Sequence, residues 1–357
     1  MINRAMGIVT KVIFLSPQLE KVWVLVEGVE NQAYAFPQEI GEIKMGETVI
    51  LNTTAVDLAL GSGNYHFVMG RCPTEMKKDR QAGHIMKLRY TPFQLKVCAV
   101  EEEASPFHEQ LRKAVGLAGV PVISGSLHSM LIPCVCGLKA IKATLRIAYV
   151  MTDGGALPLA LSRAVRKLKK ADFLCGTVTV GHAYGGDLEA VNLYSGLLAA
   201  KEVLQAEVII VLMGPGVVGT NTRWGTTALE VGQIINAIYA LGGKSYTIPR
   251  LSFSEPRERH RGISHHTITA LNQVSLAATR LVLPELSQEK KEYLLNQLER
   301  LNPEKYQLIW GRGQQGIQLA GKRGFQLDHM GRNYEEDPAF FLAASAVGEV
   351  IAREIQG

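Results

Sequence analysis

Apolar and polar positions follow two different patterns along the chain. Over residues 1–75, short apolar runs rich in β-branched residues alternate with glycine-containing turns, and no stretch of helical period interrupts them. Such runs between turn residues are typical of antiparallel strands. We therefore predict a small β-rich domain over residues 1–75, either a barrel or a sandwich. The polar stretch 76–92 follows as a linker or covering arm.

From residue 93 onward, apolar runs alternate with stretches of helical period. The strand candidates are QLKVCAV, PVIS, LRIAYV, FLCGTVTV, EVIIVLM, SYTIPRL, TRLVLP and YQLIW. Continuously apolar strands that alternate with helices predict a parallel sheet with helices on both faces, because both faces of each strand must be buried. We predict one α/β ligand-binding domain over residues 93–357, a Rossmann-like three-layer arrangement. Eight strand–helix units also fit a (β/α)8 barrel, but uneven spacing and long glycine-rich loops favour the open sheet.

Composition narrows the class of protein. Apolar residues make up 47% of the chain and charged residues 20%, which is enough to form a buried core. The net charge of +5, from 38 Lys and Arg against 33 Asp and Glu, suits a small anionic partner. It is too small and too dispersed to predict nucleic-acid binding. The sequence leaves open whether the chain forms a homo-oligomer.

The cysteines and the first residues of the chain indicate the cellular compartment in which the protein is expected. Of the five cysteines, only Cys134 and Cys136 lie close together in the sequence, and a structural zinc site would need a second such pair. We expect all five thiols to be reduced. The first residues lack the apolar core of a signal peptide, and no apolar run is long enough to predict a membrane span. We expect a cytoplasmic protein.

Glycines and titratable residues concentrate directly after the predicted strands. In a parallel sheet these segments meet at one rim, where α/β proteins bind ligands. Six of the nine histidines lie there. The candidate catalytic residues are Asp153, His182, Asp187, His265 and His266. The candidate ligand-binding residues are Gly154, Gly155, Gly185, Gly186, Gly214, Gly216, Gly219, Thr220, Arg257 and Arg259.

The segment GPGVVG, residues 214–219, matches the spacing G-x-G-x-x-G after an apolar strand. Such a loop lets backbone N–H groups approach a phosphate. Pro215 inside the turn, and a helix delayed to about Thr226, depart from the dinucleotide fingerprint. An anion-binding loop and a tight structural turn both remain open.

Two further loops carry aspartates beside glycine pairs, TDGGALP and GHAYGGDLEAVN. We expect Gly185 and Gly186 to open a helix, with Asp187 either as its N-cap or as an acid/base or metal-ligand partner of His182. Asp153 and Asp187, on neighbouring loops, also form a candidate oxygen site for a divalent metal. Apart from this candidate divalent metal, the sequence does not predict a cofactor.

The segment SEPRERHRGISHHT combines three arginines with three histidines. Arginine suits phosphate or carboxylate, and Arg257 and Arg259 are the candidates here. Ser264 is the expected N-cap of a helix whose first turn carries His265 and His266. The positive end of a helix disfavours imidazolium, so we expect neutral rings fit for metal ligation or general-base chemistry. The alternative is a solvated loop in which Glu255 and Glu258 pair with the arginines.

Some common catalytic motifs are absent from the sequence. No G-x-x-x-x-G-K-[ST] occurs, which argues against a Walker-type nucleotide hydrolase. No G-x-S-x-G elbow occurs either, and no cysteine lies in a basic loop, so motifs give no support to covalent acyl chemistry.

The strings TDGGALPLALS, GHAYGGDLEAVN, MGPGVVGTNTRWG, LSFSEPRERHRGISHHT and LNTTAVDLALGSGNYHFV resemble a bacterial protein family of unknown function. The resemblance runs over nearly the whole chain and implies a shared fold. It brings no activity, cofactor or catalytic residue. The function predicted from the residues themselves is binding of a small phosphorylated or carboxylated metabolite, with hydrolysis or group transfer as the favoured reaction class. A non-catalytic ligand-sensing or assembly protein and a nicotinamide- or flavin-dependent oxidoreductase are the alternatives.

Overall fold

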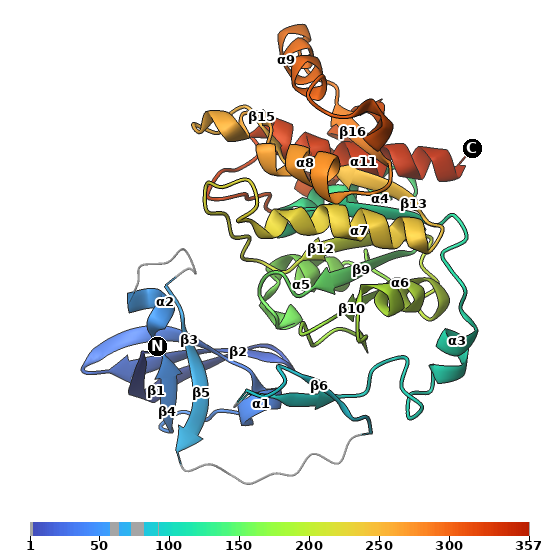
Figure 1. Ribbon diagram of the computed structural model, residues 1–357. Helices are drawn as coiled ribbons and strands as arrows, with labels where there is room; N and C mark the ends of the chain where they lie inside the picture. Colours follow the sequence, from blue (N-terminus) through green and yellow to red (C-terminus); the bar gives the residue numbers. More distant parts are fainter. Residues whose placement is uncertain (1–2, 58–63, 73–81, 92, 357) are drawn as a thin grey trace. The chain divides into compact units, whose positions relative to one another are not determined.

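The computed structural model describes residues 3–57, 64–72, 82–91 and 93–356, which form two compact units (Figure 1). One unit comprises Met1–Gln81 and Leu88–Leu95, and the other comprises Ala82–Lys87 and Lys96–Gly357. The predicted linker 76–92 lies partly outside the described residues. Within it, Lys87 is fully buried and donates hydrogen bonds to the carbonyls of Ala183 (2.8 Å) and Ala190 (3.1 Å), so this residue belongs to the packing of the second unit.

The first unit contains a closed five-stranded β-barrel, with strand order β1-β2-β3-β5-β4. Val22 and Val24 are buried, whereas Lys21 before them and Trp23 between them are not, which is the alternation expected of a strand with one face on a core. The predicted β-rich domain is confirmed, and the barrel rather than the sandwich is its form. Its elements are β1 (Arg4–Ser16), β2 (Leu19–Val26), β3 (Val29–Ala35), α1 (Pro37–Ile40), β4 (Thr48–Asn52), α2 (Thr54–Asp57) and β5 (His66–Cys72).

The second unit is built on an open sheet of eight parallel strands in the order β11-β10-β9-β12-β8-β13-β16-β17. The parallel sheet is therefore confirmed, and the alternative (β/α)8 barrel is wrong, because β11 and β17 end the sheet instead of pairing. The strands are β8 (Pro121–Gly125), β9 (Ile147–Thr152), β10 (Gly176–Thr179), β11 (Leu188–Glu189), β12 (Val208–Met213), β13 (Lys244–Ile248), β16 (Thr279–Pro284) and β17 (Tyr306–Gly311).

One of the eight predicted strands is replaced by another in this sheet. The run QLKVCAV forms β7 (Leu95–Val97), which pairs with β6 (Ile85–Lys87) in a separate two-stranded sheet. The eighth member is β11, which lies in a stretch predicted to be helical. Two residues are too few to show a strand period, so tertiary pairing with β10 decides this element.

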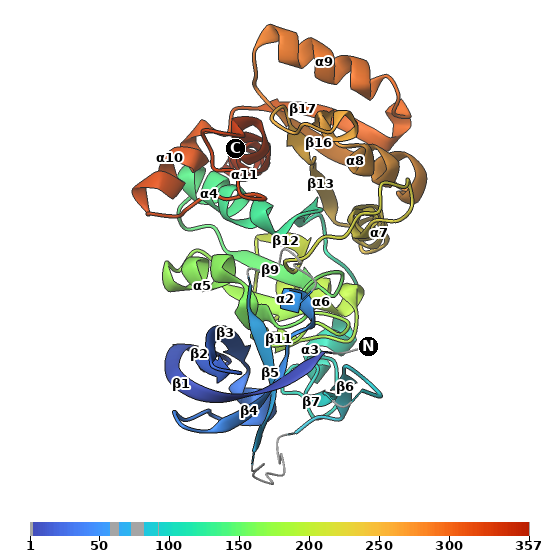
Figure 2. The ribbon, with the colours of Figure 1, turned by 90° about the vertical axis from the view of Figure 1, so that its left-hand side faces the viewer.

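Helices cover both faces of the sheet, as the apolar strands predict (Figure 2). The two faces of β12 show why: Ile210 and Leu212 belong to one apolar core, and Ile209 and Val211 belong to the other. Helices α4, α5, α10 and α11 lie on the first side, and α6 and α7 on the second. The helices are α3 (His108–Lys113), α4 (Leu131–Ile141), α5 (Arg163–Lys170), α6 (Leu193–Glu202), α7 (Glu230–Ala240), α8 (His265–Thr269), α9 (Gln288–Leu298), α10 (Gln314–Lys322) and α11 (Pro338–Gln356).

The strand order creates a crevice at the carboxyl ends of β8 and β12. These neighbouring strands are followed by α4 and α7, which lie on opposite faces, so the two connections leave the sheet in opposite directions. Open α/β sheets bind ligands at such a switch point. Among the described residues, no helix is both long and apolar enough to cross a membrane.

Candidate metal centre

The segment after β13 brings three histidines together. Strands β14 (Leu251–Ser252) and β15 (Gly262–Ile263) pair as a short antiparallel ribbon, which places His260 just before β15 and α8 just after it. Ser264 is the N-cap of α8, as predicted, and accepts a hydrogen bond from the backbone N–H of His266. The same hydroxyl is 2.7 Å from Nδ1 of His260, so one serine orients both sides of the cluster.

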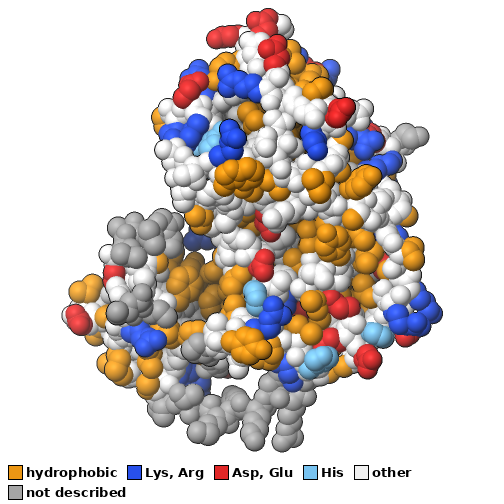
Figure 3. Space-filling model, viewed as in Figure 1, with side chains coloured by type: hydrophobic (Ala, Val, Ile, Leu, Met, Phe, Trp, Pro, Cys, Tyr) orange, Lys and Arg blue, Asp and Glu red, His pale blue; other side chains and the backbone are white. Residues whose placement is uncertain are grey.

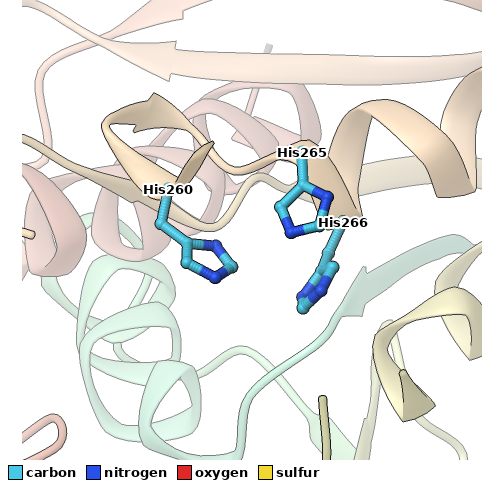
Figure 4. Close-up of side chains that lie close together, drawn as sticks. All are labelled: His260, His265 and His266. Carbon is cyan, nitrogen blue, oxygen red and sulfur yellow. The ribbon is translucent and has the colours of Figure 1, made fainter. Parts of the chain in front are cut away.

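The rings of His260, His265 and His266 point into one shared space (Figure 4). One ring nitrogen from each residue lies within 4.8 Å of the others. His260 and His266 are buried and His265 is half-buried. The Nε2 atoms of His265 and His266 are buried without a hydrogen-bond partner within the part of the chain that the structure describes. A buried polar atom left unsatisfied costs about 1–3 kcal/mol, so the cluster is poised for a ligand.

All three imidazoles are held in the neutral form. Burial, followed by the charge of Arg250, lowers the pKa of His260 to about 3. Burial and the neighbouring His265 lower the pKa of His266 to about 4, and the pKa of His265 is lowered mainly by burial. The sequence suggests the positive end of the helix as the cause, whereas burial is the largest cause in the structure.

Neutral imidazoles are the form that binds transition metals. Zn²⁺ takes histidine nitrogens at about 2.0–2.1 Å in tetrahedral geometry, which separates two such nitrogens by about 3.3 Å. The three ring nitrogens lie within 4.8 Å of one another, so each ring would need to move by at most about 1 Å for all three nitrogens to bind one Zn²⁺ ion. Three histidines leave a fourth coordination position for water or another ligand.

The glycine-rich loop after β12 covers one side of His266. This loop is a closed hairpin, in which Gly219 pairs with Thr226 and the N–H of Thr220 donates to the carbonyl of Gly225 at 2.9 Å. The hydroxyl of Thr226 is 3.5 Å from Nδ1 of His266. Gly214 and Gly216 open the loop, which is followed by a 3-10 turn, and α7 begins only at Glu230. This differs from the dinucleotide fingerprint, where the glycine turn opens the helix directly.

An ion-pair network centred on the buried residues Glu255 and Arg250 borders the cluster. Glu255 accepts two hydrogen bonds from Arg257, at 2.6 and 3.0 Å, and lies within 3.6 Å of both Arg250 and Arg332. The side-chain hydrogen bond from Arg257 lowers the pKa of Glu255 to about 2. Arg257 and Arg259 are both exposed, and Arg257 is engaged by Glu255. Basic side chains gather on the surface over β15 and α8, with a histidine visible between them (Figure 3).

Asp153 and His182 meet at the carboxyl ends of β9 and β10. The Asp153 carboxylate accepts a hydrogen bond from the backbone N–H of His182 at 2.9 Å. Gly154 lies against the carboxyl group of Glu230, which accepts a hydrogen bond from Thr152 at 2.9 Å. Burial raises the pKa of Glu230 to about 7.

The loops after β9 and β12 are in direct contact. A Cβ on Gly155 would come within 2.3 Å of the carbonyl oxygen of Gly214, and a Cβ on Gly214 within 2.3 Å of that of Ala156, so both positions require glycine. The structure therefore brings the candidates Asp153, Gly154, Gly155, His182 and Gly214 to neighbouring loops at one edge of the sheet.

Asp187 lies apart from these residues. Its carboxylate accepts hydrogen bonds from the backbone and hydroxyl of Thr177 at the start of β10, and pairs with Lys169. The expected helix at Gly185 and Gly186 is wrong: these residues lead into β11, and α6 begins at Leu193 with Asn192 as its N-cap. The hydrogen bonds of the 187–189 segment to β10 outweigh its helical pattern. Asp187 therefore has a structural partner set, and the oxygen site with Asp153 has no geometric support.

His260 and Arg250 were not among the site residues predicted from the sequence, and Glu255 was expected only as an ion-pair partner of the arginines. His260 was visible as a member of the arginine-rich segment, but its separation by five residues from His265 matches no helical or strand period. Only the turn formed by β14 and β15 brings it back onto α8. Arg250 lies two residues after the end of β13, so its place after a buried strand was the available signal.

The family model for a protein of unknown function, DUF3866, matches residues 32–348. The chain belongs to this family. The DUF3866 match extends from β3 into α11 and so includes every strand of the parallel sheet and all three histidines of the cluster. The family resemblance stated from the sequence is confirmed. No curated protein sequence matches the chain.

Proposed function

We propose that this protein binds a divalent transition metal, with Zn²⁺ as the expected ion, through His260, His265 and His266, and uses it to bind and hydrolyse a small phosphorylated or carboxylated metabolite. The observation that carries the proposal is the convergence of three imidazole nitrogens within 4.8 Å, two of them on rings whose Nε2 atoms are buried and have no hydrogen-bond partner among the described residues. Metal coordination would satisfy these atoms without displacing protons from the rings.

The charge balance of the site favours an anionic ligand. Three neutral imidazoles leave the full charge of a divalent ion uncompensated. Between positions 250 and 266 the chain carries four arginines against two glutamates. An anion at the fourth coordination position would therefore meet a positive potential, and exposed Arg259 lies where it would assist approach.

Hydrolysis is the reaction class that this donor set supports best. A metal with three histidine ligands and one open position lowers the pKa of bound water to near 7 and polarises a carbonyl or phosphoryl oxygen. The chain would supply the ligands, their orientation through Ser264, and a loop that shields one side of His266.

Metal binding is tested by titrating Zn²⁺ into chelator-treated protein in a calorimeter, and by the visible spectrum of the Co²⁺ form. We expect one ion per chain and a tetrahedral Co²⁺ spectrum. His260→Gln, His265→Gln and His266→Gln should each weaken binding by 10-fold or more, since each removes one ligand. His84→Gln, which alters a surface histidine paired with Glu102, is the matched control. Binding that is equal in all four variants refutes the proposal.

Anion binding and turnover are tested on the same Co²⁺ protein. Inorganic phosphate or acetate should shift its spectrum, and a panel of phosphate monoesters and carboxylic esters should be screened for metal-dependent hydrolysis. Anion binding without turnover would favour the alternative of a ligand-sensing protein. No spectral shift with either anion would refute the anionic ligand class.

A further inference from the structure

A cavity of about 1070 Å³ opens at the carboxyl ends of β8 and β12. Its volume matches that of small-molecule sites, which commonly measure about 300–1,000 Å³. Apolar side chains from several elements form much of its wall, including Ile132, Val217 and Phe325. Ser129 and His329 line the same cavity and play no part in the proposed metal centre.

Ser129 and His329 form a hydrogen-bonded pair. Oγ of Ser129 is 3.1 Å from Nδ1 of His329, although 200 residues separate them in the sequence. Ser129 lies in the 3-10 turn His128–Met130, which joins β8 to α4. The approach of a serine hydroxyl to an imidazole nitrogen is the basic geometry of an activated nucleophile.

The imidazole of His329 is fixed in place. It stacks on the ring of Phe340 at 3.8 Å with an interplanar angle of 8°, and its backbone exchanges hydrogen bonds with Arg332. Burial, followed by the charges of Arg250 and Arg332, lowers the pKa of His329 to about 3. The ring is therefore neutral at pH 7, and with its proton on Nε2 it accepts the hydroxyl proton of Ser129 at Nδ1.

A second serine–histidine pair nearby provides a contrast. Ser162 is 2.6 Å from Nε2 of His128, but its Oγ also accepts the N–H of Val165 as the N-cap of α5. Ser162 is only 1% exposed and does not line the cavity, whereas Ser129 is half-buried and does. Of the two hydroxyls, that of Ser129 is the one a ligand can reach.

We propose that Ser129 and His329 form a second, metal-independent catalytic site that hydrolyses small apolar acyl esters by a covalent acyl-serine intermediate. Oγ of Ser129 bonds to the acyl carbon while its proton moves to Nδ1 of His329. The ester C–O bond then breaks, and the departing alkoxide takes that proton from His329. Water attacks the acyl-serine and gives a proton to Nδ1, the ester bond to Oγ breaks, and Ser129 recovers the proton.

The environment of the pair restricts its substrates. The apolar walls formed by Ile132, Val217 and Phe325 suit a hydrocarbon acyl chain. A weakly basic imidazole gives limited assistance to proton transfer. Esters with a good leaving group, such as aryl esters, are therefore the substrate class, and amides are excluded from it.

The test uses the intact chain in EDTA, so that metal chemistry does not contribute. A fluorophosphonate probe should form a phosphonyl ester at Oγ of Ser129 with loss of fluoride, and peptide mass mapping on the unaltered chain locates it. p-Nitrophenyl butyrate should be hydrolysed with a burst. Ser129→Ala should abolish labelling and burst, and His329→Gln should slow hydrolysis by about 10-fold, because the imidazole it removes is a weak base. Ser162→Ala, the matched control, should still be labelled.

Each outcome decides the proposal. A label on Ser129, together with loss of hydrolysis in Ser129→Ala, supports it. No labelling, labelling at another residue, or unchanged hydrolysis of p-nitrophenyl butyrate by Ser129→Ala overturns it. Because all measurements are made in EDTA, a failure of the zinc proposal leaves this test unaffected, and the reverse also holds.

Discussion

Gly219 packs directly against the ring of His266. A Cβ added to this glycine would lie 3.1 Å from Cε1 and 3.7 Å from Nε2 of the histidine. The first distance is tighter than a comfortable van der Waals contact, so a side chain here must displace either the ring or the loop. The absence of a side chain at position 219 therefore helps to set the position of an imidazole that we assign to the metal centre.

Gly219→Val should weaken Zn²⁺ binding by about 10-fold or more, which corresponds to about 1.4 kcal/mol. The branched side chain would push His266 away from His260 and His265. Calorimetric titration of the chelator-treated variant measures the effect. Gly70→Val is the control, because a Cβ at Gly70 meets no atom of the described residues within 4 Å beyond its own chain neighbours. Wild-type affinity in Gly219→Val would contradict the assigned contact.

The histidines of the metal-free cluster should stay neutral at pH 7. Burial and the charge of Arg250 lower the pKa of His260 to about 3, and burial lowers that of His266 to about 4. The unfolded chain therefore binds more protons than the folded protein below about pH 6.5, and stability falls as the pH decreases from there. NMR titration of the ring protons measures the pKa values directly. Values at or above 6.5 for all three rings would contradict neutral ligation.

Glu230→Gln should stabilise the protein at neutral and higher pH. Burial raises the pKa of Glu230 from about 4.5 to about 7, so the folded protein holds this proton more tightly than the unfolded chain. Stability is then greatest below pH 4.5 for this group and falls as the pH rises through about 7. A shift of this size corresponds to roughly 3 kcal/mol.

Glutamine keeps an oxygen for the hydroxyl of Thr152 and carries no charge. Urea unfolding at pH 5 and pH 8 should therefore show a smaller loss of stability in the Glu230→Gln variant than in the wild type. Glu289→Gln, at an exposed position on α9, is the control. An equal pH dependence in wild type and Glu230→Gln would show that Glu230 is ionised at little cost.

Gly137→Ala should destabilise the sheet unit by about 1–3 kcal/mol, the usual cost of overpacking. Gly137 lies on α4 where it crosses α11, and a Cβ would come within 2.2 Å of the carbonyl oxygen of Ser345. The two helices would have to separate. Urea unfolding measures the change, and Gly321→Ala on α10 is the control, because within the described part of the chain its Cβ meets no atom within 4 Å outside its own helix backbone and chain neighbours. An unchanged free energy of unfolding in Gly137→Ala would refute the close packing of α4 on α11.

The pattern of apolar positions predicts the class of fold because burial decides it locally. The run VIIVLM, apolar at every position, requires cover on both faces, and β12 has that cover, since Ile210 is buried in the core on one face and Ile209 in the core on the other. Helix α4 was not predicted, because residues 131–138 are buried all round and show no polar face. A helix without a polar face has no period to detect.

The candidate site was predictable where chemistry and position coincide in the chain. Ser264 before two histidines predicts an N-cap and two rings in one helical turn, and the structure has both. The contacts of His260 with that turn arise from the ribbon of β14 and β15, and the proximity of Gly219 arises from a hairpin after β12. Neither contact leaves a periodic signal in the sequence.

The sequence by itself determines that this chain forms a β-rich unit and a parallel α/β sheet, and that histidines and glycines follow the strands. These properties depend on local spacing and on the burial of each segment. Only the tertiary structure decides which of those residues meet. It brings His260 to His265 and His266, pairs Ser129 with His329 across 200 residues, and separates Asp187 from Asp153. Contacts between distant segments depend on strand order and loop path, which the local pattern of the chain does not encode.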